Sequence, residues 1–184
     1  MGQALKAGVR AVQLREKDLA TRDLYDLAGK LLAMTRGAGA ALLVNDRVDV
    51  AMALSADGVH LTRRSLPLKE ARAILGPEKL IGISCHSLAE VQEAEDGGAD
   101  LIVLGPIFET PSKAGFGPPL TTSILRQARM TTSIPILAIG GINSHRVPEV
   151  MAAGANGISV ISAVMAAPDA AGACMELLAA VAAG

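Results

Sequence analysis

Residues 134–162 read IPILAIGGINSHRVPEVMAAGANGISVIS and contain a short apolar run, a segment of helical character and a second short apolar run. The two runs, Ile136–Ile139 and Ile158–Ile161, have the length and β-branched content of buried strands. Small residues, AAGA, join the intervening helix to the second run. A strand, a helix and a strand in this order predict one unit of a parallel sheet, because the helix returns the chain to the same end.

Similar units precede this stretch. Five further apolar runs are predicted to be strands: Ala11–Leu14, Leu42–Val44, Gly58–Leu61, Leu80–Ile83 and Leu101–Leu104. Four junctions, AGVRAVQL, ADGVHL, GGADLIVL and AGANGISVI, resemble one another and recur roughly every 40–56 residues, about one quarter of a barrel of eight βα units. Ser87 and Ser144 are expected to cap two of the helices between the strands.

The pattern predicts an α/β fold, a single TIM (β/α)₈-type barrel domain over residues 1–184 that lacks its first strand. The segment QALKAGVRAVQL begins within a helix, so the eighth strand is expected before residue 1. Either the N-terminus is truncated, or the barrel closes in another way, for example with a partner chain. An open doubly wound sheet is the main alternative, although the Gly-rich dinucleotide fingerprint of that fold is absent.

Composition excludes several classes of partner. The net charge of -1 and the pI near 6.3 give no basic field for nucleic acid or an anionic membrane. The two cysteines, Cys85 and Cys174, are far apart without the spacing of metal ligands, and no signal peptide or membrane span is evident. We therefore expect a cytoplasmic protein that acts on small molecules, with a homo-oligomer left open as its assembly state.

Barrel enzymes bind their substrates where the strands end, so the polar residues after each apolar run are the candidates. Gln13, Arg15 and Lys17 alternate after the first run and therefore point to one side, as a clamp for an anion would. A solvated strand exit is the alternative. Asn45 and Asp46 follow the second run. The Asp46 carboxylate can hold Mg²⁺ beside phosphate oxygens, or can simply cap a helix.

Later strands end in further candidates. Ser84 and His86 follow the fourth run, and Ser84 is the preferred binding residue because a single histidine is more often structural. The Pro- and Gly-rich segment GPIFETPSKAGFGPPL carries three more candidates over the barrel mouth, or forms a purely structural loop. These three residues are Thr110, Ser112 and Lys113.

The last two runs predict a phosphate site. Gly140 and Gly141 follow the sixth run, and Ser162 follows the seventh. Backbone N–H groups at these positions can bind a phosphate, as they often do in this fold. The two glycines can instead serve only a tight turn.

Several motifs in the same order resemble the thiamine phosphate synthase family and its close branch of thiazole tautomerases: VQLREK, VNDRVDVAMALSADGVHL, IGISCHS, GADLIVLGPIFETPSK, IPILAIGGI and GANGISVIS. The likeness runs from Gln13 to Val164. It implies a barrel with a role in thiamine biosynthesis, in which a synthase joins an aminopyrimidine-methyl diphosphate to a thiazole phosphate and releases diphosphate, with Mg²⁺ as cofactor.

The resemblance also implies roles for matching residues. Gln13, Arg15, Lys17, Asn45 and Ser84 would bind the pyrimidine diphosphate, Asp46 would bind Mg²⁺, and Lys113 would stabilise the departing diphosphate. Thr110, Ser112, Gly141, Ile161 and Ser162 would bind the thiazole phosphate, with Gly140 in the same turn.

Two positions depart from the family pattern. Ser65 stands where the synthases carry a second Mg²⁺-binding aspartate, and Arg63 and Arg64 add positive charge there. Pro106 stands where the tautomerase branch has a catalytic histidine, while Lys17 and Asp46 suit a diphosphate and its metal. A synthase-like transferase is therefore the leading hypothesis. The alternatives are a thiazole tautomerase and a non-catalytic regulatory protein that binds the thiazole phosphate.

Overall fold

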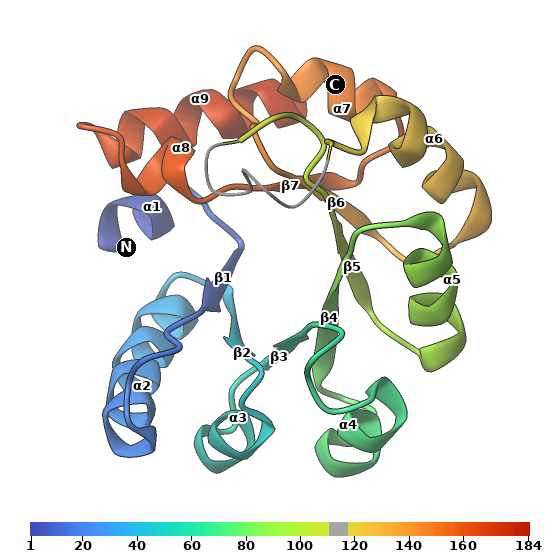
Figure 1. Cartoon of the computed structure of the whole chain (residues 1–184). Helices are drawn as coiled ribbons and strands as arrows, with labels where there is room; N and C mark the ends of the chain where they lie inside the picture. The colour runs from blue at the N-terminus through green and yellow to red at the C-terminus, as the bar shows by residue number, and fades with distance from the viewer. Residues whose placement is uncertain (111–117) are drawn as a thin grey trace.

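A computed structural model describes residues 1–110 and 118–184 of the chain. It contains a parallel sheet whose strands follow chain order, with each strand paired to the next. The sheet curls into a barrel-like wall with helices on its outer side (Figure 1). Its seven strands are β1 (Ala11–Leu14), β2 (Ala41–Asn45), β3 (Gly58–Leu61), β4 (Leu80–Cys85), β5 (Leu101–Leu104), β6 (Ile136–Ile139) and β7 (Gly157–Ser159).

The helices follow the strands in alternation and cover the convex side of the sheet (Figure 1). They are α1 (Gly2–Lys6), α2 (Thr21–Gly37), α3 (Val48–Leu54), α4 (Leu68–Leu75), α5 (Leu88–Gly97), α6 (Thr121–Thr131), α7 (Val147–Ala152), α8 (Ser162–Met165) and α9 (Ala170–Ala182). Within these described ranges, no helix has both the length and the apolar character needed to cross a membrane.

The core lies between the sheet and the helices. Alternate strand residues such as Val44, Val59 and Ile102 are fully buried there, against helix residues such as Ala28 and Ala94. Small alanines bring the helices close to the branched side chains of the strands, as a core with so few aromatic residues requires. The other strand residues face the inside of the curled sheet, which leaves that face for polar side chains at the strand ends.

The prediction of a (β/α)₈-type barrel is confirmed. In the part of the chain that the structure describes, the sheet has seven strands, and β1 and β7 are its two outermost strands. All predicted strands exist, and four of them have the predicted bounds. The run Ile158–Ile161 is different, because β7 ends at Ser159 and Ile161 is the N-cap of α8. Ser87 caps α5 as predicted. The Ser144 cap is wrong, because α7 begins at Val147.

The repeated junctions have a structural cause that the sequence did not reveal. Three of them carry Asp57, Asp100 and Asn156 immediately before β3, β5 and β7. Each side chain accepts a hydrogen bond from a backbone N–H of the preceding strand, at 2.8 Å from Leu42, 2.7 Å from Ile81 and 2.9 Å from Ile136. These bonds tie neighbouring strands together at the amino-terminal edge of the sheet.

We predict that Asp57→Ala destabilises the fold, because the N–H of the fully buried Leu42 loses its acceptor. An unpaired buried N–H costs about 1–3 kcal/mol in the free energy of unfolding, which urea titration measures. Asp57→Asn retains an acceptor oxygen and should cost less. Equal stability of Asp57→Ala and the unchanged chain would show that this bond does not hold the strands together.

Candidate functional site

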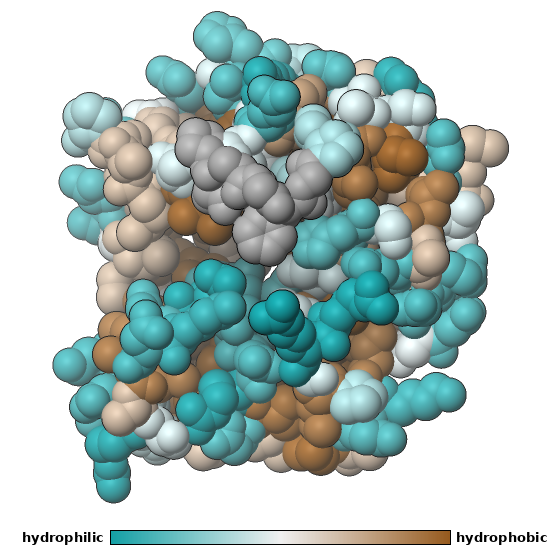
Figure 2. All heavy atoms as spheres, viewed as in Figure 1, coloured by the Kyte–Doolittle hydropathy of each residue, from teal (hydrophilic) through white to brown (hydrophobic). Residues whose placement is uncertain are grey.

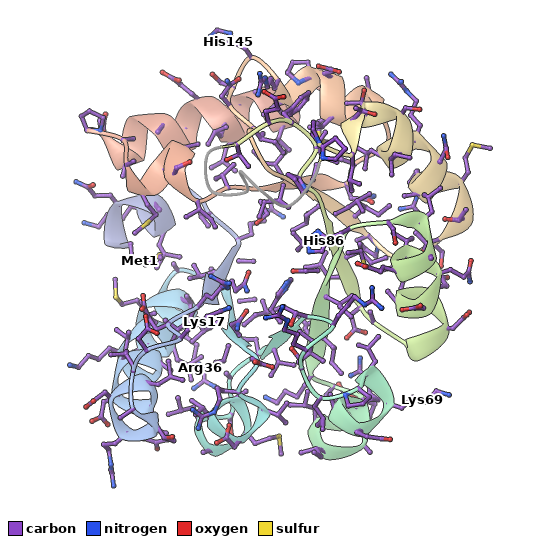
Figure 3. All side chains as sticks on the ribbon, in the orientation of Figure 1. Met1, Lys17, Arg36, Lys69, His86 and His145 are labelled. Atoms are coloured by element: carbon purple, nitrogen blue, oxygen red, sulfur yellow. The ribbon has the colours of Figure 1, made fainter. Side chains whose placement is uncertain are left out.

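The carboxyl ends of all seven strands lie at one end of the barrel, because the strands are parallel. Figure 2 shows hydrophilic side chains gathered on this face over β1 to β4. Lys17, after β1, and His86, after β4, lie on opposite sides of the open end (Figure 3). Every sequence-predicted site residue in the described ranges belongs to this edge or to the loops that follow it.

The ends of β1 and β2 are joined by their side chains. The Nε2 of Gln13 donates a hydrogen bond of 2.9 Å to Oδ1 of Asn45. Val12 and Leu14 are buried on the helix side, so the alternation of the strand turns Gln13 to the inside of the barrel. The two predicted binding residues therefore meet on the inner wall.

The ends of β3 and β4 are joined by a buried pair. The Nε2 of His60 lies 2.8 Å from Oγ of Ser84, at hydrogen-bond distance, and His60 is only 3% exposed. A Cβ atom at Gly82 would lie 2.9 Å from Nδ1 of His60, so this glycine makes room for the ring. Burial, and secondly the charge of Arg15, lowers the pKa of His60 to about 4. The imidazole is therefore neutral near pH 7.

Arg15 and Lys17 have the properties of an anion clamp. Both side chains are exposed, and neither has a hydrogen-bond or ion-pair partner within residues 1–110 and 118–184. The positive charge of Arg15 contributes to the lowered pKa of His60. Two unpaired cations beside a neutral polar pair can attract a phosphate or diphosphate group.

Asp46 lies just past β2, with its side chain exposed and its backbone in the left-handed region at φ 67°. Its N–H donates to the carbonyl oxygen of His60 at 2.9 Å, which fixes this turn beside β3. The carboxylate is available to a cation. The helix-cap alternative is not observed, because the N-cap of α3 is Arg47 and no side chain caps it.

The loop after β3 supplies no second carboxylate. The Oγ of Ser65 accepts a hydrogen bond of 2.8 Å from the N–H of Thr62, and the N–H of Ser65 donates back to the Thr62 carbonyl at 3.0 Å. Arg63 forms an ion pair of 3.1 Å with Glu90. In the part of the chain that the structure describes, no three His, Cys, Asp or Glu side chains are grouped as metal ligands.

Gly140 and Gly141 form a turn after β6 with positive φ angles of 98° and 64°, a conformation that favours glycine. The N–H groups of Gly141 and Ser162 have no acceptor among residues 1–110 and 118–184. Ile161, which is 65% exposed, caps the short helix that begins at Ser162. Unpaired N–H groups after β6 and β7 can bind a phosphate.

The loop after β5 completes the edge. Thr110 is half-buried and is the last described residue of this loop before residue 118. Ser112 and Lys113 lie outside the described residues. Nδ1 of His86 forms a hydrogen bond with the Gly105 carbonyl oxygen, which agrees with a structural role for this histidine.

Sequence reasoning missed His60 and Arg146. His60 lies in the apolar run GVHL. It alternates with Val59 and Leu61, and this alternation could have indicated that its side chain points to the inside of the barrel. Arg146 binds the Gly141 carbonyl oxygen through Nη1 at 2.7 Å, and no local pattern in the sequence indicates this contact.

Comparisons with known proteins agree with this geometry. A family model described as thiamine monophosphate synthase matches residues 1–164. The chain is 48% identical to a putative thiamine-phosphate synthase of Geobacter sulfurreducens, over 90% of this chain and 78% of the relative. It is 47% identical to the thiamine-phosphate synthase of Moorella thermoacetica, over 95% of this chain and 83% of the relative.

Solved structures give the same result. The fold matches the thiamine phosphate pyrophosphorylase from Pyrococcus furiosus with a TM-score of 0.92 and 40% identity, over 99% of this chain and 87% of that chain. A 3-hexulose-6-phosphate synthase matches with a TM-score of 0.70 at 18% identity, over 97% of this chain and 93% of that chain, which shows a shared fold only.

The buried His60 predicts a stability that depends on pH. An unfolded histidine has a pKa of about 6.5, so between that pH and about 4 the unfolded chain binds a proton that folded His60 does not. This contribution is complete above pH 6.5 and is lost as the pH falls toward 4. The free energy of unfolding should fall by about 2 kcal/mol between pH 7 and pH 5 from this group.

His60→Gln should reduce that fall, because glutamine does not titrate. His145→Gln is the control, since His145 is exposed on the outer surface (Figure 3). Urea unfolding at both pH values measures the difference. The same loss for His60→Gln and the unchanged chain would contradict a neutral buried imidazole.

Proposed function

This chain belongs to the thiamine monophosphate synthase family, and from that membership we propose that it joins an aminopyrimidine-methyl diphosphate to a thiazole phosphate and releases diphosphate. The observation that carries the proposal is the presence of two separate anion-binding features on one barrel edge. Within residues 1–110 and 118–184, Arg15 and Lys17 after β1 have no side-chain partner, and the N–H groups of Gly141 and Ser162, after β6 and β7, have no acceptor. A reaction between two phosphorylated substrates needs both.

The ends of β1 to β4 would bind the pyrimidine diphosphate. Arg15 and Lys17 supply positive charge for its phosphates, because no described side chain neutralises them. Gln13, Asn45 and Ser84 offer hydrogen-bonding groups on the inner wall for the pyrimidine ring. The Gln13–Asn45 bond and the His60–Ser84 bond hold these groups in fixed orientations before the substrate binds. Such preorganised polar groups favour catalysis, because they need no reorientation during the reaction.

The thiazole phosphate would bind across the barrel at the ends of β6 and β7. The N–H groups of Gly141 and Ser162 are its proposed donors, with Gly140 giving the turn its shape and Ile161 lining the approach. Thr110 and Ser112 are proposed to contact the same substrate from the loop after β5. Backbone donors suit this role because their positions are fixed by the fold.

The chemistry requires charge to be stabilised where it develops. The bond between the pyrimidine methylene carbon and a diphosphate oxygen breaks, and its electron pair leaves with the diphosphate. The thiazole ring nitrogen then donates its electron pair to the methylene carbon, which forms the new C–N bond. Arg15, Lys17 and Lys113 are proposed to stabilise the negative charge that grows on the diphosphate.

Mg²⁺ is the cofactor that we propose, and the residues present fit it in one limited way. Asp46 would hold the ion with a single carboxylate, and diphosphate oxygens would supply further ligands, which is a common arrangement for Mg²⁺. The ion would supply positive charge to the leaving group. Ser65 cannot replace a second carboxylate, because it is neutral and its hydroxyl is bonded to Thr62.

A tautomerase activity is less well supported. Pro106 has no side-chain group that can transfer a proton, and its carbonyl oxygen accepts a hydrogen bond of 2.8 Å from the N–H of Leu120. The unpaired cations after β1 also have no evident use for a single thiazole phosphate. Incubating the protein with both substrates and Mg²⁺ tests the proposal, and detection of thiamine phosphate is the expected result. Tautomer exchange without thiamine phosphate would overturn it.

Lys113→Ala should lower kcat on the order of 100–1000-fold, because removing one preorganised charge from a leaving group commonly costs that much. Binding of thiazole phosphate should change little. Lys69→Ala is the control, since Lys69 points away from the barrel on the outer side of α4 (Figure 3). A Lys113→Ala protein that turns over as fast as the unchanged chain would remove this lysine from the mechanism.

Mg²⁺ affinity should depend on diphosphate, because Asp46 supplies only one protein carboxylate. Calorimetry should show weak Mg²⁺ binding alone and at least about tenfold tighter binding with inorganic diphosphate present. Asp46→Asn should abolish this gain. Tight Mg²⁺ binding without diphosphate would mean that other ligands hold the ion.

A further inference from the structure

Arg146 connects the turn after β6 to the loop after β5. It is the N-cap of α7, and its Nη1 donates a hydrogen bond of 2.7 Å to the carbonyl oxygen of Gly141. The guanidinium carbon lies 4.6 Å from the centroid of the Phe108 ring, within the range of a cation–π contact. One half-buried side chain therefore touches both loops.

The turn is already packed tightly against that loop on its other side. The N–H of Phe108 donates to the Gly140 carbonyl oxygen at 3.1 Å. A Cβ atom at Gly140 would lie 2.5 Å from Cβ of Pro106, and one at Gly141 would lie 2.5 Å from the carbonyl oxygen of Glu109. Two glycines allow this approach, but glycine also leaves the backbone free to take other conformations.

These contacts determine where the N–H groups of the turn point. In a planar trans peptide the carbonyl and the following N–H point in opposite directions. The bond from Phe108 to the Gly140 carbonyl therefore orients the N–H of Gly141, and the bond from Arg146 to the Gly141 carbonyl orients the N–H of Ile142. Neither N–H has an acceptor within the two described ranges.

We propose that Arg146 is a positioning residue for the phosphate turn. Its contact with Phe108 holds the residue whose N–H bonds Gly140 and so orients the N–H of Gly141, a proposed phosphate donor, and its own bond to the Gly141 carbonyl orients the next N–H, that of Ile142. This inference rests on the proposed function and adds a residue to it. Arg146 does not contact the substrate in this account. A guanidinium suits the role because its planar face covers the ring while an edge N–H donates in plane, which a lysine ammonium cannot do together.

Arg146→Ala should raise KM for the thiazole phosphate about 10–100-fold, because the loss of one hydrogen bond from a charged group weakens binding by about that factor. KM for the pyrimidine diphosphate should stay unchanged. Arg146→Lys can restore the bond but not the stacking, so its KM should fall between the two. Arg129→Ala is the matched control. Arg129 also donates hydrogen bonds to main-chain carbonyls, those of Thr132 and Ile134. These carbonyls precede β6 and therefore lie at the amino-terminal end of the barrel, away from the candidate site.

Binding of inorganic phosphate, measured by calorimetry, gives a second readout that does not need catalysis. Its affinity should fall in Arg146→Ala and stay unchanged in Arg129→Ala. If Arg146→Ala does not fold, Phe108→Leu removes the stacking alone and should raise KM for the thiazole phosphate in the same direction by a smaller factor.

Three outcomes would overturn the inference: an unchanged KM for the thiazole phosphate in a folded Arg146→Ala protein, an equal rise for both substrates, or an equal rise in Arg129→Ala. Failure of the proposed function is distinct from these. In that case the unchanged chain makes no thiamine phosphate, while the phosphate affinities of the variants still test the role of Arg146.

Discussion

The main-chain hydrogen bonds between neighbouring parallel strands determine where the candidate site residues at the strand ends lie. Because β1 to β7 pair in chain order and in one direction, their carboxyl ends form a single edge. Residues that are far apart in sequence, such as Gln13 and Asn45, become direct neighbours there. At the amino-terminal end of the strands, Asp57, Asp100 and Asn156 accept hydrogen bonds from N–H groups in the first two residues of β2, β4 and β6, which tie neighbouring strands together. The hydrogen bonds that tie the strands together and the candidate site residues thus lie at opposite ends of the same strands.

The edge that carries the candidate site has two halves with different chemistry. The half formed by β1 to β4 offers the exposed charges of Arg15 and Lys17 beside an inner wall that includes the neutral His60. The half formed by β6 and β7 offers backbone N–H groups, whose positions depend on the packing of Gly140 and Gly141 against the loop after β5. Positive side chains suit a diphosphate leaving group, because its negative charge grows during the reaction. Fixed backbone N–H groups suit a phosphate that only anchors its substrate.

Most of the fold could be predicted from local patterns, since each strand is a short apolar run bounded by small residues. Where prediction failed, contacts distant in sequence decided the outcome. The run Ile158–Ile161 is mostly apolar, yet pairing with β6 ends at Ser159 and the chain turns into α8. For candidate residues that directly follow a strand, the location at the carboxyl end of the sheet could be predicted, because parallel strands all end on the same side. His60 was hidden within an apolar run, and Arg146 acts through Gly141 and Phe108, a contact that only the folded chain creates.

We propose that two phosphorylated groups bind at opposite halves of one barrel edge. A crystal structure of the protein with thiamine phosphate, diphosphate and Mg²⁺ is the decisive measurement. We expect the phosphate of thiamine phosphate on the N–H groups of Gly141 and Ser162, and the diphosphate beside Arg15 and Lys17 with Mg²⁺ on Asp46. A thiamine phosphate whose phosphate lies at the ends of β1 to β3, or outside the barrel edge, would contradict it.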